Sequence, residues 1–353
     1  MTDPRHPDEP ILEPELRIID PHHHLWDRVA LLPTLPPVQH EFERIVRLAP
    51  RYLLDELLAD MRSGHNVVAT VFVECGSMYR AEGPPEQAPL GETEFVNGQA
   101  AMCASGGYGA VRACAGIVGH ADLMLGDRVA AVLEAHVGLA PDRFRGIRYS
   151  AAHDADRTVL GPLARRPAGV FMDRKFREGF ARLAPLGLSF DAWLLEPQLL
   201  ELIDLARTFP DTAIILDHVG TPLGIAAYAG RRGERFETWR ARIHELARCS
   251  NVVVKVGGLA MPFGGFNPGV GAAPLSERLA DLWRPYVETC IEAFGADRCM
   301  MESNFPVDLY TCGYAVLWNA LKRLASGASA TEKTALFSGV AERVYRLAPN
   351  LVS

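Results

Sequence analysis

The sequence has no long basic run, no membrane-length apolar stretch and no CxxC pair. Its 36 Lys and Arg residues are outnumbered by 43 Asp and Glu residues, a formal net charge of −7, which argues against nucleic acid as the main partner. No segment approaches the roughly 20 unbroken apolar residues of a membrane span, so we expect no membrane partner. The seven cysteines, an odd number, fit a reducing cytoplasm better than a disulfide framework.

Two common catalytic signatures are also missing. There is no GxSxG elbow, so a serine hydrolase of that type is not indicated. No glycine-rich loop follows the first apolar run, which argues against a dinucleotide-binding open sheet. What the chain does have is 48% hydrophobic residues, enough for a large core.

One pattern repeats eight times along the chain: a short, nearly continuous apolar run followed by a segment with helical spacing. Such runs are typical of parallel strands that are buried on both faces. Eight β-then-α units favour a closed barrel over an open sheet. The runs are residues 17–24, 66–76, 113–120, 144–150, 188–195, 213–220, 251–258 and 298–306.

The repeat predicts an α/β protein with a single (β/α)₈ TIM barrel over residues 17–353, preceded by a flexible N-terminal arm of residues 1–16. In such barrels the functional site lies at the C-terminal ends of the strands. Three long segments follow predicted strands, at residues 25–50, 77–92 and 259–275. We expect them to cover the site.

The strongest local signal is the run Asp20-Pro-His22-His23-His24-Leu-Trp26 at the end of the first strand. Side chains at i, i+2 and i+4 of a strand point to the same side. Asp20, His22 and His24 are therefore expected to share the barrel interior. Paired imidazoles there suit a divalent metal or two donors to a substrate oxygen.

Polar residues end several other predicted strands. His218 adds a third histidine after the sixth strand, and Glu302 and Asn304 share a face of the eighth. Arg145 and Arg148 alternate in the fourth strand, so only one of them should face inward, where a guanidinium can grip a carboxylate. Further residues expected at the substrate are Trp26, Glu74 and Asp191.

At these residues the sequence resembles a known family. The run IIDPHHHLWD is similar to the Asp-x-His-x-His-x-Trp opening of the amidohydrolase superfamily, in its amidohydrolase-related branch with 2-pyrone-4,6-dicarboxylate lactonase and the sugar lactonases. FRGIRYS, LDHVGTP, NVVVKVGG and RCMMESNFPVD resemble later strand signatures of that branch, in the same order. The resemblance spans residues 17 to 347 and implies a (β/α)₈ barrel.

The resemblance also implies residue roles. His22 and His24 match the histidine pair of the first strand and His218 matches that of the sixth, while Arg145 and Arg148 fall where the lactonase binds its substrate carboxylate. One position departs, because the branch typically carries an aspartate where this chain has Asn304. An amide accepts no proton from water at neutral pH, so we expect Glu302 to serve as the base or ligand instead.

The function expected from these residues is hydrolysis of a lactone or similar ester of a small substrate that bears a carboxylate. His22, His24 and His218 would polarise the carbonyl, Arg148 would hold the carboxylate, and Glu302 would activate water. The alternatives are a metal-dependent non-oxidative decarboxylase and a non-catalytic binding barrel. The first is disfavoured because Asp191 and Trp193 stand where a histidine is needed; Asn304 is the feature that favours the second.

The sequence is compatible with a bound metal and with a metal-free site. One divalent ion, zinc or manganese, could be bound by His22, His24, His218 and Glu302. The lactonases of the branch work without metal, so metal-free activity is the equal alternative. A homodimer is compatible with a barrel of this size.

Overall fold

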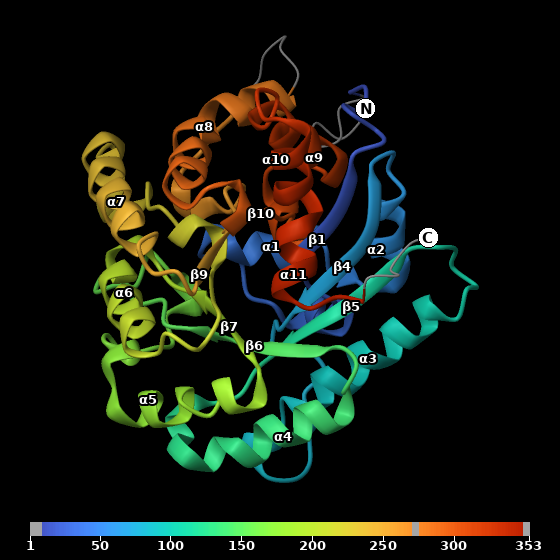
Figure 1. Cartoon of the computed structure of the whole chain (residues 1–353), viewed down its shortest axis with the longest axis vertical. Helices are drawn as coiled ribbons and strands as arrows, with labels where there is room; N and C mark the ends of the chain where they lie inside the picture. Colours follow the sequence, from blue (N-terminus) through green and yellow to red (C-terminus); the bar gives the residue numbers. More distant parts are fainter. Residues whose placement is uncertain (1–8, 270–274, 349–353) are drawn as a thin grey trace.

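The computed structural model describes residues 9–269 and 275–348. In this part of the chain, eight parallel strands form one sheet in sequence order, and helices surround it (Figure 1). Each strand lies within, or within a residue of, one of the eight predicted runs, so the single (β/α)₈ barrel is confirmed. The strands are Arg17–His23 (β1), Asn66–Val73 (β4), Arg112–Gly119 (β5), Phe144–Ser150 (β6), Ser189–Trp193 (β7), Ile214–Leu216 (β8), Val252–Val256 (β9) and Cys299–Met301 (β10).

The helices lie outside this sheet. Two short antiparallel strands of two residues each, Trp26–Asp27 (β2) and Arg51–Tyr52 (β3), pair with each other in a separate sheet. No described helix meets the length and hydropathy that crossing a membrane requires. The helices are Arg44–Leu48 (α1), Leu54–Met61 (α2), Leu90–Ala104 (α3), Val129–Leu139 (α4), Arg174–Phe180 (α5), Leu199–Thr208 (α6), Arg232–Leu246 (α7), Leu275–Phe294 (α8), Tyr314–Leu324 (α9), Ala330–Thr334 (α10) and Val340–Val344 (α11).

The strands are buried on both faces, as their apolar runs require. Ile19, Val71, Ile215 and Met300 pack inside the barrel together with Tyr345, which directly follows α11. The ring closes through the residues after β10. The backbone N–H of His24 donates to the carbonyl of Phe305 at 2.8 Å.

The predicted grouping of Asp20 with His22 and His24 is wrong. Between Asp20 and His23, β1 advances three residues while β4 advances two, a bulge that reverses the alternation of side chains. Asp20 consequently accepts hydrogen bonds from the hydroxyls of Ser303, at 2.5 Å, and of Tyr314 in α9, at 3.0 Å. It braces the barrel closure, and His22 takes the inward position.

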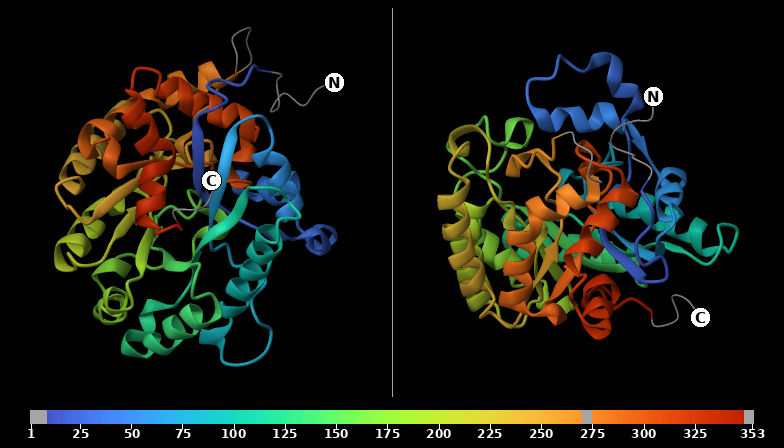
Figure 2. Two further views of the ribbon diagram at one scale, coloured as in Figure 1. Left: turned by 45° about the vertical axis from the view of Figure 1, so that its right-hand side comes forward. Right: turned by 90° about the horizontal axis from the view of Figure 1, so that it is seen from above.

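Segments that follow several strands pack together over the mouth of the barrel. Trp26, Ile45, Leu160 and Phe263 belong to one apolar cluster above the strand ends. The segment 25–50, blue in Figure 2, and the red helix α11 lie on opposite sides of the barrel. Part of the third expected cover, residues 270–274, lies outside the described residues.

The described part of the N-terminal arm, residues 9–16, is tethered to the barrel. Lys322 of α9 donates to the carbonyls of Leu12 and Glu13, at 2.9 and 2.8 Å. The side chain of Asn319 accepts from the backbone N–H of Leu12 at 2.9 Å. Residues 1–8 lie outside the described chain.

We expect Tyr314→Phe to lower the free energy of unfolding by about 1–3 kcal/mol, because it removes a hydrogen bond to the fully buried Asp20. Urea denaturation measures this change. Tyr310→Phe is the matched control, since its hydroxyl donates to Glu41 at the surface. Equal losses in the two variants would contradict a bracing role for Asp20.

Candidate active site

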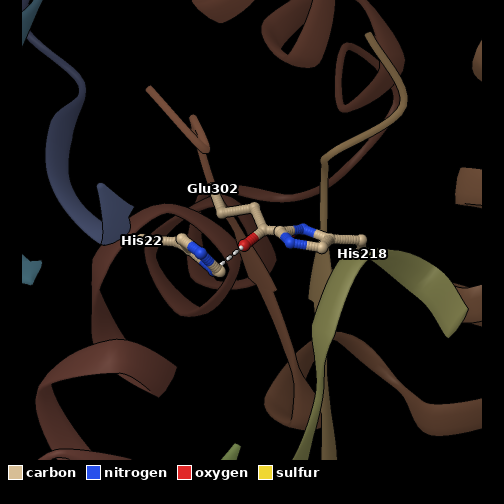
Figure 3. Close-up of side chains that lie close together, drawn as sticks. All are labelled: His22, His218 and Glu302. Atoms are coloured by element: carbon tan, nitrogen blue, oxygen red, sulfur yellow. Dashed lines mark hydrogen bonds and ion pairs between the residues drawn. The ribbon is translucent and has the colours of Figure 1, made fainter. Parts of the chain in front are cut away.

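Three buried side chains meet at the mouth of the barrel (Figure 3). The carboxylate of Glu302 lies between two imidazoles, with Oε1 2.8 Å from Nδ1 of His218 and Oε2 2.8 Å from Nδ1 of His22. A carboxylate oxygen only accepts, so the hydrogen bond to His218 places a proton on that ring's Nδ1. No described residue hydrogen-bonds to Nε2 of His218, the nitrogen that carries the lone pair when the ring is neutral.

An unusual turn directs His218 into this cluster. His218 and Val219 both have left-handed backbone angles, with φ of 54° and 49°, a conformation that β-branched residues rarely adopt. Two glycines after β9 provide the space. A Cβ on Gly258 would lie 2.4 Å from Nδ1 of His218, and a Cβ on Gly257 would lie 2.4 Å from Cγ of Glu302.

His24 stands beside His22 but makes its own contact. Its Nδ1 donates to the carbonyl of Val73 at 2.7 Å, and the two rings meet edge to face with centroids 4.9 Å apart. Trp26 stacks on His24, with its indole N–H bound to the carbonyl of Ala49 at 2.7 Å. Trp26 therefore covers His24 from the side of the segment 25–50.

Of the two arginines of β6, the structure brings only Arg148 to this cluster. Its Nε donates to Oε1 of Glu74 at 2.9 Å, its Nη2 donates to the Glu74 carbonyl, and its Nη1 lies 3.3 Å from Nε2 of His22. Arg145 lies near the start of the strand and donates to the carbonyls of Asp142 and Phe144. It is at the end of β6 that is opposite to the mouth.

Lys255 of β9 is a site residue that the sequence analysis did not identify. Its Nζ donates to Oδ2 of Asp191 at 2.6 Å, contacts Nδ1 of His22 at 3.2 Å and forms an ion pair with Asp217 at 3.2 Å. The side chain is fully buried. A lysine inside the apolar run NVVVKV was the available signal, because a charge within a buried parallel strand needs partners.

Asp191 lies deeper in the barrel, bound to Lys255 and Tyr345. Its Oδ2 also accepts a hydrogen bond from the hydroxyl of Tyr345 at 2.7 Å, and its side chain is fully buried. Tyr345 belongs to the packed interior of the barrel. Asp191 therefore lies below the histidines, where burial raises its pKa to about 6.

Asn304 is turned to a different partner. Its amide donates to Oδ1 of Asp308 at 2.8 Å, and its backbone N–H donates to the carbonyl of His22 at 2.9 Å. Within the described chain it makes no side-chain hydrogen bond to the three histidines. Asn304 thus supports the backbone of His22, while Glu302 supplies the carboxylate of the cluster.

The imidazoles of His22 and His24 are neutral at neutral pH. Burial lowers the pKa of His22 well below its usual value, and the Lys255 ammonium lowers it further. Burial and then Arg148 have the same effect on the pKa of His24. Burial also lowers the pKa of Lys255, but Asp191, Asp217 and Glu302 together raise it more, so Lys255 stays charged.

Donor atoms of His22, His218 and Glu302 lie within 4.8 Å of one another, as in a metal site. Oε2 of Glu302 has no hydrogen bond among the described residues and is available as a ligand. His22 is not available, because the Lys255 ammonium faces its Nδ1 and the Arg148 guanidinium faces its Nε2. The arrangement does not fit a divalent ion unless one of these cations moves away.

A cavity of about 330 Å³ lies among residues that follow β4 and β5, and its lining includes none of the residues of the cluster. One of its lining residues, His120, contacts the carbonyl of Arg148 through Nδ1 at 3.1 Å. The side chains of Arg148 and Glu74 are 11% and 15% exposed, whereas those of His22 and Glu302 are fully buried. The cavity is lined by Tyr79, Pro85, Glu86, Pro89, His120, Asp122 and Leu125.

Residues 19–347 match the family model described as amidohydrolase. The chain belongs to the amidohydrolase family. The Sinorhizobium fredii protein y4mH is 36% identical to it over 340 residues, which cover 94% of this chain and 99% of that protein. An L-fucono-1,5-lactonase from Burkholderia multivorans is 29% identical over 210 residues, covering 58% of this chain and 64% of the lactonase.

A solved amidohydrolase from Burkholderia multivorans has the same fold, with a TM-score of 0.69 and 26% identity over 94% of this chain and 99% of that chain. Crystal structures of it exist with bound HEPES and with bound zinc. Family membership agrees with an enzyme, and the lactonase names among its relatives agree with a hydrolase.

We expect Gly258→Ala to disrupt the His218–Glu302 pair, because its Cβ would lie 2.4 Å from the His218 ring. Gly230→Ala is the matched control, since Gly230 also has a positive φ, 77° against 64°, but nothing lies within 4 Å of its Cβ. Each variant should lose about 1–2 kcal/mol of stability to the backbone angle. A further loss of stability is expected only for Gly258→Ala, and thermal denaturation of the two variants measures it.

Proposed function

We propose that this amidohydrolase hydrolyses a lactone that carries hydroxyl groups. The observation that supports this most directly is the His218–Glu302 pair, in which the carboxylate orients the ring through Nδ1 and leaves Nε2 as a base. A buried carboxylate that holds an imidazole in this way is a common arrangement for general base catalysis. The expected role of Glu302 thereby changes from base to orienting group.

In the proposed reaction, Nε2 of His218 takes a proton from water while the water oxygen bonds to the lactone carbonyl carbon. The C–O bond of the ring then breaks, and the proton passes from His218 to the departing ring oxygen. Glu302 stabilises the imidazolium between these steps, as a neighbouring carboxylate does. Arg148 and the adjacent His22 stabilise the oxyanion, and each such donor typically contributes about 2.7–4 kcal/mol.

The substrate class follows from the charges around Arg148. The expected carboxylate grip has little support, because Glu74 already occupies Nε and Nη2 of Arg148, and Arg145 lies at the other end of the strand. The cavity lined by His120 instead offers Tyr79, Glu86 and Asp122, groups that hydrogen-bond to hydroxyls. The relatives named L-fucono-1,5-lactonase agree with such a substrate.

The two alternatives receive less support. A metal-dependent decarboxylase needs a metal that binds the substrate carboxylate, and both nitrogens of His22 face cations. A binding protein without catalysis would not need the His218–Glu302 pair. Turnover of a panel of sugar lactones distinguishes the hydrolase from the binding protein, and carbon dioxide release identifies the decarboxylase.

We expect His218→Gln to lower kcat for the best lactone of the panel by about 10²–10⁴-fold, the usual contribution of a general base. Glu302→Gln should give a smaller loss, because the base remains but its orienting carboxylate is gone. His244→Gln, at an exposed position of α7, controls for the loss of a histidine. Full activity of His218→Gln would refute the proposed base.

We expect a chelator to leave lactone hydrolysis unchanged, because the proposed steps use only side chains of this chain. Elemental analysis of protein purified without a His tag, with assays before and after chelation, measures this. One zinc or manganese per chain with activity lost on chelation would contradict the proposal and favour the decarboxylase.

A further inference from the structure

His22 has a cationic hydrogen-bond donor at each ring nitrogen. Nζ of Lys255 lies 3.2 Å from Nδ1, and Nη1 of Arg148 lies 3.3 Å from Nε2. A protonated ring would be repelled from both sides, and a neutral ring has a single lone pair. Only one of the two cations can therefore donate to His22, and the proton of the ring faces the other.

The two cations differ in their exposure to solvent. Lys255 is fully buried, bound to Asp191 at 2.6 Å and paired with Asp217 at 3.2 Å. Arg148 is 11% exposed. A donor without an acceptor costs most where neither water nor a substrate can reach it, so the lone pair of His22 belongs on the Lys255 side.

Glu302 does not reverse this assignment. Oε2 of Glu302 lies 2.8 Å from Nδ1 of His22. This oxygen nevertheless has no hydrogen-bond partner among the described residues, because its direction from Nδ1 does not meet hydrogen-bonding geometry. The contact of Lys255 with the same nitrogen has that geometry. The structure thus distinguishes the two neighbours of Nδ1.

In a second lysine–histidine pair of the same chain, both ring nitrogens of the histidine have a hydrogen-bond partner of known role. Nζ of Lys322 donates to Nδ1 of His65 at 2.8 Å, and Nε2 of His65 faces the carbonyl of Ala315 at 3.0 Å. A carbonyl only accepts, so the proton of His65 is on Nε2 and its lone pair faces the lysine. His22 has the lysine but not the carbonyl.

We propose that Lys255 is a positioning residue that fixes the tautomer of His22, with Nδ1 accepting from the ammonium and the proton held on Nε2. The N–H of Nε2 and Nη1 of Arg148 then form two adjacent donors without a hydrogen-bond acceptor among the described residues, since Oδ2 of Asp217 is 4.0 Å from Nη1. An oxygen that develops negative charge satisfies both. This use of the donor pair rests on the proposed lactone hydrolysis, whereas the tautomer itself does not.

Nitrogen NMR of the histidine side chains tests the tautomer without any substrate. Protonated and unprotonated ring nitrogens resonate far apart, and long-range nitrogen–proton correlations identify the protonated one. The signals of His22 are those lost in His22→Gln. In the wild-type protein, as purified, we expect both His22 and His65 to carry their proton on Nε2.

A proton on Nδ1 of His22, or a metal on its Nε2, would overturn the proposal. Neither result depends on whether lactones are turned over. A failed lactone assay with the expected tautomer would instead refute the proposed function alone.

Substitution of the lysine tests the cause. In Lys255→Met, Nδ1 loses its donor and Arg148 remains, so the proton of His22 should move to Nδ1. Lys255→Met leaves the Asp191 carboxylate without its cation, which can prevent folding. The double variant Lys255→Met with Asp191→Asn removes this unpaired charge. Lys322→Met is the matched control, in which the Ala315 carbonyl should keep the proton of His65 on Nε2. An unchanged His22 in a folded Lys255 variant would contradict the role of Lys255.

Discussion

One buried ammonium determines how the centre of this barrel is arranged. Lys255 binds Asp191, pairs with Asp217 and contacts His22, all without access to solvent. Its removal would leave buried carboxylates without a counter-charge, a situation that costs several kcal/mol. Because the same ammonium faces His22, the charge balance that stabilises the fold also acts on a histidine of the proposed site. Tyr345, which follows the last described helix, completes this centre from below through its hydrogen bond to Asp191.

The fold was predictable because buried parallel strands must be apolar on both faces, and the eight runs record that requirement directly. The site was predictable to the extent that parallel strands bring their C-terminal ends together. The alternation of side chains along a strand was the least reliable basis for prediction. It could not reveal the bulge that turns Asp20 outward, nor which of Arg145 and Arg148 faces the mouth, since both depend on the pairing register. Lys255 was missed because it lies within an apolar strand and not in the polar residues after it, although a lysine within such a run is itself a signal.

The neighbours of Asn304 explain why this chain carries an asparagine where the related branch typically carries an aspartate. An aspartate there would face Asp308 across the 2.8 Å now bridged by the amide, and Asp308 is already a buried carboxyl whose pKa burial raises well above its usual value. Two carboxylates at that distance would repel each other unless one held a proton. The asparagine donates where an aspartate would not, and Glu302 reaches the histidines in the space left by Gly257 and Gly258.

The charge of the site affects both substrate entry and product release in the proposed reaction. Four carboxylates surround the cluster, and two cations, Lys255 and Arg148, oppose them, so the carboxylates outnumber the cations. The carboxylates are Glu74, Asp191, Asp217 and Glu302. An uncharged lactone enters such a site without electrostatic cost, whereas the carboxylate that ring opening creates is repelled by groups of like sign only a few ångströms away. The same surplus that disfavours an anionic substrate therefore promotes release of the product.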